Sequence, residues 1–267
     1  KGATRWLSIG GLSLQPSEFL KPAFAVVSAW LISVNRLDPR FPGYIVATVL
    51  LGVCVFVLLQ QPDVGMTLMV TGVYFVQLFL IGLPFIVVGL LVGLFAGGGV
   101  AAYFMYSHVR QRVDNFFDPS SGEGYQVSRA LEAFQAGGLF GRGPGEGRVK
   151  QVLPDAHSDF ILAVAGEEFG VLLCLLVVAL FAFVVLRGFS RTLKDENLFV
   201  VLAGSGLLAQ FGMQALINMA SSIHIIPPKG ITLPFISYGG SSTIALAWAI
   251  GIVLALTRER PSPRGQP

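Results

Sequence analysis

The chain has 267 residues, of which 54% are apolar and 12% are charged, with 18 Lys and Arg against 15 Asp and Glu. Soluble domains carry about 25% charged residues, so this chain has about half the usual supply, and its mean hydropathy is +0.71. This composition excludes an ordinary soluble enzyme and a disordered chain, and it leaves an integral membrane protein. The formal net charge of +3 favours a positive-inside bias over nucleic-acid binding.

Seven apolar stretches are candidates for membrane-spanning helices, which need about 20 predominantly apolar residues. In chain order they cover residues 19–35, 42–60, 64–81, 84–106, 160–186, 198–218 and 242–257. The sequence thus predicts an all-α bundle of membrane helices that forms a single domain over residues 1–267. The chain opens with Lys1 and has no signal peptide, so we expect that an N-terminal part of the protein is missing.

The cations of the short loops predict how these helices are oriented. With the N-terminus outside, the short inner segments carry eight cations: Arg36, Arg40, Arg187, Arg191, Lys194, Arg258, Arg260 and Arg264. The short outer segments carry three: Lys1, Arg5 and Lys229. The positive-inside rule therefore favours this orientation.

In this orientation a loop of 54 residues, 107–160, lies outside, and a loop of this length is often functional. Within it, residues 125–134 have apolar side chains at helical spacing and predict a short helix. The glycine-rich run 137–147 that follows lacks the Lys-Ser/Thr of a phosphate-binding loop. Two interpretations stay open for this run: a flexible turn, or a backbone that closely approaches a ligand. The cations beside it are Arg142, Arg148 and Lys150.

Charged residues at membrane depth are costly, which makes them functional candidates. Four of them lie at the outer face in this orientation: Glu18, Lys21, Asp63 and Asp159. Each also has an ordinary structural explanation, because an acid suits the first turn of a helix, a lysine can pair with that acid, and an aspartate can cap a helix. Together they bring carboxylates and a cation to one depth, where a cleft would suit the anionic head group of a lipid.

Residues 218–241 stay apolar although Pro227, Pro228 and Pro234 break any helix. Irregular backbone at membrane depth is tolerated where it is buried in protein or lines a wet cavity. We therefore predict a re-entrant outer segment, with Lys229 as its cation.

Six motifs, in order along the chain, carry a resemblance that covers essentially all of it. They read GATRW at 2–6, QPSE at 15–18, QPDVG at 61–65, LPDAHSDF at 153–160, GEEFG at 166–170 and ISYGGSS at 236–242. Together they resemble the SEDS family, named for shape, elongation, division and sporulation. The resemblance implies a ten-helix fold, of which seven helices are present here. Residues 228–234, which read PKGITLP, resemble the division branch of the family more than the elongation branch.

The resemblance implies peptidoglycan glycosyltransferase activity on lipid II, a disaccharide-pentapeptide carried on undecaprenyl pyrophosphate. The aspartate of the family's His-Thr-Asp-Phe motif corresponds to Asp159, which is thereby implied as the catalytic general base. Undecaprenyl pyrophosphate would be the leaving group. The candidates for substrate binding are Arg5, Trp6, Glu18, Lys21, Asp63, Arg142, Arg148, Lys150, His157, Lys229 and Ser237.

The cofactor, the partners and the location follow from the same resemblance. The sequence offers no dedicated metal cage, so no cofactor is certain, although Asp159 with Glu18 or Asp63 could hold a divalent cation such as Mg²⁺ or Mn²⁺ through phosphate. The implied protein partners are a class B penicillin-binding protein, which is a transpeptidase, and other division proteins, with no nucleic acid. The implied location is the bacterial inner membrane at the division septum, with the site facing outside.

Two other functions stay open. A lipid II flippase would use the same polar residues as a translocation path, but it needs charges through the bilayer, where only Glu167 and Glu168 are expected, deeper in the fifth span. A non-catalytic scaffold would only recruit and activate the penicillin-binding protein. It predicts that substitutions in the pocket leave division intact.

Overall fold

The computed structural model describes residues 6–9, 12–61, 63–82, 122–227 and 230–258, together with isolated positions between 83 and 121. Most of this part of the chain is helical, and a short antiparallel hairpin that pairs Leu7 with Leu14 precedes the first helix. In chain order the elements are β1 (Leu7–Ile9), β2 (Leu12–Leu14), α1 (Pro16–Leu37), α2 (Gly43–Gln60), α3 (Val64–Leu80), α6 (Gly122–Gly137), η1 (Val149–Gln151), α7 (Ile161–Thr192), α8 (Leu198–Ser222) and α9 (Gly240–Leu256).

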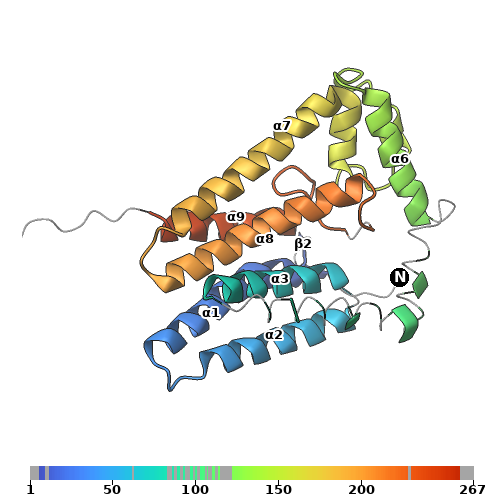
Figure 1. Ribbon diagram of the computed structural model, residues 1–267. Helices are drawn as coiled ribbons and strands as arrows, with labels where there is room; N and C mark the ends of the chain where they lie inside the picture. The colour runs from blue at the N-terminus through green and yellow to red at the C-terminus, as the bar shows by residue number, and fades with distance from the viewer. Residues whose placement is uncertain are drawn as a thin grey trace, which may run out of the picture.

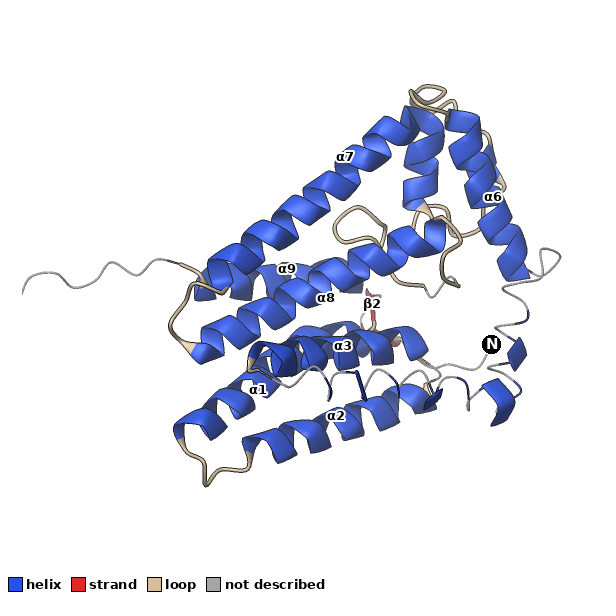
Figure 2. Cartoon of the chain, viewed as in Figure 1, coloured by secondary structure: helices blue, strands red, loops and turns tan. Residues whose placement is uncertain are grey.

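Six of the seven predicted membrane spans are helices in the structure, so the helical membrane bundle expected from the sequence is confirmed. Helices α1, α2, α7 and α8 are long and apolar enough to cross a membrane, and α3 and α9 are shorter apolar helices. The predicted span over residues 84–106 lies mostly outside the described residues. Figure 2 shows α1, α2, α3 and α8 running side by side, and each of these helices contacts the next one in the bundle.

Local sequence explains where several of these helices begin. α1 starts with a proline and has Glu18 in its first turn, which suits the free N–H groups and the positive end of a helix. Asp63 caps α3 by accepting a hydrogen bond of 3.1 Å from the N–H of Met66. Asn197 caps α8 in the same way, at 3.0 Å from the N–H of Phe199. The capping explanation considered for Asp63 is thus confirmed.

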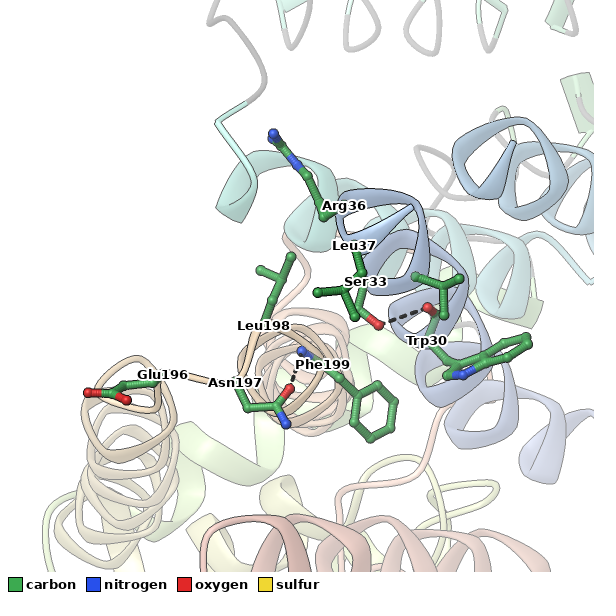
Figure 3. Close-up of a pocket in the computed structure, with 9 residues that line it drawn as sticks. Trp30, Ser33, Arg36, Leu37, Glu196, Asn197, Leu198 and Phe199 are labelled. Carbon is green, nitrogen blue, oxygen red and sulfur yellow. Dashed lines mark hydrogen bonds between the residues drawn. The ribbon is translucent and has the colours of Figure 1, made fainter. Parts of the chain in front are cut away.

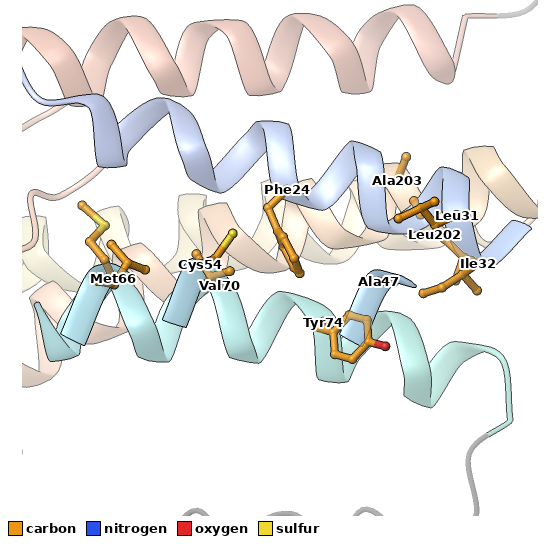
Figure 4. Packing of buried hydrophobic residues seen from close by; sticks show 12 residues of the cluster. Phe24, Leu31, Ile32, Ala47, Cys54, Met66, Val70, Tyr74, Leu202 and Ala203 are labelled. Carbon is orange, nitrogen blue, oxygen red and sulfur yellow. The ribbon is translucent and has the colours of Figure 1, made fainter. Parts of the chain in front are cut away.

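Helix α8 is the centre of the bundle, where it contacts α1, α3, α7 and α9. Small residues allow this close packing: a Cβ on Gly204 would lie 2.6 Å from Thr192, and one on Gly206 would lie 2.7 Å from Gln77. Figure 4 shows one of the apolar clusters that result, with side chains from α1, α2, α3 and α8.

The connections gather at two ends of the bundle. In Figure 1 the turn between α1 and α2, the turn between α7 and α8, and the end of α9 share one end. The opposite end carries the start of α1, the turn between α2 and α3 and the segment between α8 and α9. The connections therefore divide between two ends in the same way as the inner and outer sides that the loop cations predict for them.

Helix α7 bends sharply at Gly170, which the sequence did not predict. This residue has φ +81° and ψ 175°, and Figure 1 shows the chain changing direction at the outer end of α7. A Cβ on Gly170 would lie 2.2 Å from the carbonyl oxygen of Leu139, so glycine is needed for both its conformation and its close contact. Glu167 and Glu168, which were expected deeper in a continuous span, instead lie at this bend.

The short helix predicted inside the outer loop is present as α6 and extends beyond residues 125–134 at both ends. Its buried residues Val127, Ala130 and Ala133 pack with Phe160 and Ala163 near the start of α7. Figure 1 shows α6 beside the part of α7 that precedes the bend. The described part of the outer loop, residues 122–160, is therefore a packed structure that holds the beginning of α7 in place.

Candidate functional site

Asp159 lies in a tight turn directly before α7. The turn begins at Asp155, whose φ of +52° is left-handed, a conformation that aspartate tolerates better than most residues. The carbonyl oxygen of Asp155 accepts hydrogen bonds from the N–H groups of Ser158 and Asp159 at 3.1 and 3.0 Å. The N-cap residue of α7 is Phe160, with no side-chain hydrogen bond. Asp159 therefore does not cap α7 in the way that Asp63 caps α3.

The surroundings of Asp159 favour its protonated form. Its burial is the largest cause, and the neighbouring charge of Asp155 acts in the same direction, while Ser158 and His157 act against it. Together these influences raise the pKa of Asp159 from 3.8 to about 6. A carboxyl group with this pKa is mostly ionised at neutral pH and is a better proton acceptor than an ordinary aspartate.

The segment between α8 and α9 closes over the Asp159 turn. The irregular backbone predicted for residues 218–241 is shorter in the structure, because α8 continues to Ser222 and α9 begins at Gly240. Residues 223–227 and 230–239 between them are described. The N–H of Tyr238 donates a 2.9 Å hydrogen bond to the carbonyl oxygen of His157, and the two rings meet edge to face with centroids 5.6 Å apart. Gly230 lies beside Asp159, because a Cβ built on Gly230 would be 3.8 Å from Asp159 Oδ2.

The side chain of Asn218 joins the two segments. It lies in the last turns of α8 with 1% of its surface exposed. Its Nδ2 donates hydrogen bonds to the carbonyl oxygens of Asp159, at 2.9 Å, and Ile231, at 2.8 Å. The backbone at Asp159 and the backbone next to Gly230 are thus tied to one side chain.

A buried polar network continues from this point to α1. Lys21 is 1% exposed and forms an ion pair of 2.9 Å with Glu18. Its Nζ also donates to Gln214 Oε1 at 2.9 Å. Gln214, one helical turn before Asn218, donates in turn to the carbonyl oxygen of Thr232 at 3.1 Å and to Ser242 Oγ at 3.0 Å. Two neighbouring amides of α8 therefore bind consecutive residues of the segment that faces Asp159.

The structure brings some of the predicted site residues together and separates others. His157 flanks Asp159, and Glu18 and Lys21 connect to the same region through Gln214. Ser237 stabilises the segment between α8 and α9, because its hydroxyl accepts a 2.8 Å hydrogen bond from the N–H of Leu233 in the same segment.

The remaining candidates are occupied elsewhere or lie apart. Asp63 caps α3, and Trp6 is exposed on the hairpin. Arg142 donates to the carbonyl oxygen of Ala136. Arg5 and Lys229 lie outside the described residues.

The glycine-rich run packs against the bend of α7, which favours a structural explanation for its glycines. A Cβ on Gly137 would lie 1.9 Å from the carbonyl oxygen of Gly166, and one on Gly141 would lie 2.2 Å from that of Glu168. The close approach that these glycines permit is thus to another part of the same chain. Lys150, one of the flanking cations, forms an ion pair with Glu168.

Glu167 organises the residues that follow the run. Its side chain is fully buried and accepts hydrogen bonds from three consecutive backbone N–H groups, at 2.7, 2.9 and 3.2 Å. These groups belong to Arg148, Val149 and Lys150, so the carboxylate holds η1 in place. Arg148 therefore contributes its backbone N–H to this structure.

Sequence reasoning missed Asn218 and Gln214, which lie at the centre of the site. Their signal was present: Gln210, Gln214 and Asn218 are polar residues spaced four apart on an apolar helix, and therefore share one face. Polar side chains within membrane helices commonly form hydrogen bonds to neighbouring helices.

A hollow in the described part of the chain lies far from Asp159, at the other end of the bundle. Among the described residues, no group of three or more His, Cys, Asp or Glu side chains is placed to hold a metal ion. Figure 3 shows residues that line a hollow between the end of α1 and the start of α8. The volume of this hollow is about 660 Å³. Leu198 lines it, and this residue is about 30 Å from Asn218 along α8 at 1.5 Å per residue. The lining residues are Trp30, Ser33, Val34, Arg36, Leu37, Glu196, Asn197, Leu198 and Phe199.

The fold and the site thus define a membrane helix bundle with a buried polar network and a half-buried carboxylate at one end. Residues 1–262 match the model of the FtsW/RodA/SpoVE family, described as cell cycle protein. The chain is 45% identical to the probable peptidoglycan glycosyltransferase FtsW of Caulobacter vibrioides, over 99% of this chain and 68% of that protein. The chain belongs to the FtsW/RodA/SpoVE family, and the resemblance seen in the sequence motifs is confirmed.

Solved structures agree with this assignment. One similar chain comes from a structure described as structural coordination of polymerization and crosslinking by a peptidoglycan synthase complex. The TM-score is 0.79 at 31% identity, and the match covers 96% of this chain and 74% of the other. The rod shape determining protein RodA of Thermus thermophilus matches with a TM-score of 0.69 at 30% identity, over 98% of this chain and 71% of that one.

Proposed function

We propose that this protein is a peptidoglycan glycosyltransferase that polymerises lipid II into glycan strands. The observation that carries the proposal is the position of Asp159: a half-buried carboxylate with a pKa of about 6, at the end of the bundle where a lipid-linked sugar would meet the protein. The name of the Caulobacter vibrioides relative supports the same activity.

In the proposed reaction Asp159 accepts the proton of the 4-hydroxyl group of GlcNAc in an acceptor lipid II. The hydroxyl oxygen attacks the anomeric carbon of the MurNAc at the end of the growing chain, and the new glycosidic bond forms with inversion. The bond to the pyrophosphate breaks, and undecaprenyl pyrophosphate leaves with the electron pair. Cations stabilise that leaving group, and Lys21, which is bonded to Gln214 one helical turn before Asn218, is a candidate.

The proposed partner is a class B penicillin-binding protein, whose transpeptidase would cross-link the new strand. Support comes from the solved complex, whose description joins polymerization with crosslinking. The proposed location is the inner membrane at the division septum, because the curated relatives are named FtsW. We also propose that a divalent cation could bind through the substrate's pyrophosphate, for which the sequence offers Asp159 with Glu18 or Asp63, of which Glu18 is paired with Lys21 and Asp63 caps α3.

The test is polymerisation of labelled lipid II by the full-length protein with its partner, in detergent and in liposomes. We expect Asp159→Asn to lower the rate by about 100-fold or more, since general bases contribute factors of about 10² to 10⁴. Asp155→Asn is the matched control, because it changes the neighbouring aspartate of the same turn and is expected to keep activity at pH 8.

Three results would decide against parts of the proposal. Polymerisation retained by Asp159→Asn excludes the general-base role. Lipid II translocation into liposomes without any chain growth by the unsubstituted protein favours a flippase. Normal division in cells that carry only a polymerisation-dead variant favours a scaffold.

A further inference from the structure

We propose that Asn218 is a positioning residue for the reaction: its side-chain amide fixes the Asp159 turn against the outer segment at Gly230. This inference rests on the proposed function, in which Asp159 is the base. Asn218 itself does not contact the reacting atoms, because it binds backbone carbonyl oxygens on the side of the turn that faces α8.

The geometry requires an amide at this position. A side-chain NH₂ group has two N–H donors, and Asn218 directs them to the carbonyl oxygens of Asp159 and Ile231, at 2.9 and 2.8 Å. These two residues are far apart in the sequence, so one side chain ties together two segments, which are also joined by the hydrogen bond from the N–H of Tyr238 to the carbonyl oxygen of His157. An aspartate would present only acceptors to the same two oxygens, and a leucine would leave both without this donor.

The two carbonyl groups bonded by Asn218 lie next to the Asp159 carboxylate and next to Gly230. One belongs to Asp159 itself, so the amide fixes the backbone from which the carboxylate projects. The other belongs to Ile231, the neighbour of Gly230, whose built Cβ would be 3.8 Å from Asp159 Oδ2. Asn218 therefore sets the spacing between the carboxylate and the backbone that covers one side of it.

The choice of an asparagine is not explained by packing alone. Its Oδ1 is buried without a hydrogen-bond partner among the described residues, which carries a free-energy cost that an apolar side chain would avoid. The two hydrogen bonds donated by its Nδ2 offset this cost. Gln214 makes the corresponding bond to Thr232, at 3.1 Å, so the backbone of this segment is fixed at two successive residues.

The predicted consequence is a change in catalysis and in its pH dependence. Without the amide, the Asp159 turn can move away from Gly230 and become more hydrated. Burial is the largest cause of the raised pKa of Asp159, so this pKa should move down toward the ordinary value of aspartate. The titratable groups near it are Asp155 and His157 of its own turn and Tyr238, which packs on His157, while Asn218 of α8 and Gly230 carry no charge.

The decisive comparison is Asn218→Gln with Asn218→Met in the full-length protein with its partner. The two side chains are similar in length and volume, but only glutamine carries the two N–H donors. We expect Asn218→Met to lower kcat by about 10- to 100-fold, the order expected for a misplaced reacting group. The KM for lipid II should change by less than about threefold, and the acidic limb of the rate profile should shift to lower pH. Asn218→Gln should keep the position of the wild-type limb and a higher kcat than the methionine variant.

Ser222→Ala is the control for a general change in α8. Its hydroxyl donates a 3.0 Å hydrogen bond to the backbone carbonyl of Asn218, and its removal should leave both kcat and the acidic limb of the pH–rate profile unchanged. If Asn218→Gln and Asn218→Met have the same kcat and the same midpoint for the acidic limb of the pH–rate profile, the inference is overturned and the proposed function stays in place. Full activity of Asp159→Asn would instead overturn the proposed function, whatever the Asn218 variants do.

Discussion

Lys21 Nζ lies 2.9 Å from Gln214 Oε1, so a buried ammonium group joins α1 to the helix that also carries Asn218. The same lysine pairs with Glu18 at 2.9 Å. This buried cation is therefore held between a carboxylate and an amide, and its position is fixed before any substrate arrives.

We predict that Lys21→Met destabilises the protein and that a second change, Glu18→Gln, reverses much of this loss. Removing one member of a buried ion pair costs about 3 to 5 kcal/mol, because the remaining charge is left uncompensated, whereas replacing both members is far less harmful. The measurement is the melting temperature of each variant in detergent. The double variant should remain inactive in polymerisation, because it lacks the cation for the pyrophosphate. A double variant that regains both stability and activity would show that the pair is only structural.

Asp155→Asn should shift the pH dependence of polymerisation toward acid. The rate should rise with pH through about 6 as Asp159 loses its proton. The charge of Asp155 helps to raise that pKa, so its removal should lower the midpoint of the acidic limb. Asparagine also tolerates the left-handed φ of this position. Asp195→Asn, at the opposite end of α8, should leave the midpoint unchanged, and a midpoint that stays in place or rises in Asp155→Asn contradicts the prediction.

Asp159→Asn should stabilise the protein at neutral pH. The folded state raises the pKa of this carboxyl group from 3.8 to about 6, so it binds the proton more tightly than the unfolded chain does. Ionised Asp159 therefore disfavours folding above pH 6, and this penalty vanishes below pH 3.8, where both states are protonated. Melting temperatures at pH 8 and pH 4 test the sign: the variant should gain stability at pH 8 and lose that gain at pH 4. An equal shift at both pH values would exclude ionisation as the cause.

Much of the fold could be predicted because its determinants are local. The apolar stretches became α1, α2, α3, α7, α8 and α9, since length and hydropathy alone decide whether a segment can cross a membrane. The cap at Asp63 and the helix α6 follow from residues within a few positions of each other.

The bend in α7 and the hydrogen bonds of Asn218 depend on contacts between distant parts of the chain. A glycine inside an apolar stretch is common in membrane helices, so the sequence does not reveal that Gly170 takes a positive φ and packs against Leu139. Likewise the role of Asp159 could be proposed from its motif, but the hydrogen bond that its carbonyl oxygen accepts from Asn218 could not. The partners of Asn218 are 59 and 13 residues away in the sequence, and no local pattern pairs them.

A comparison of two glycines tests whether the bend in α7 holds the outer loop together. Gly170 and Gly145 have nearly the same φ, +81° and +83°. A Cβ on Gly170 would lie 2.2 Å from a carbonyl oxygen, whereas one on Gly145 would meet nothing within 4 Å. Both alanine variants suffer backbone strain of about 1 to 3 kcal/mol, but only Gly170→Ala must also displace the turn that follows α6. We therefore expect Gly170→Ala to lower the melting temperature more than Gly145→Ala does, and to increase the rate of proteolysis within residues 138–160. Similar behaviour of the two variants would mean that the conformation of Gly170 matters and its contact with Leu139 does not.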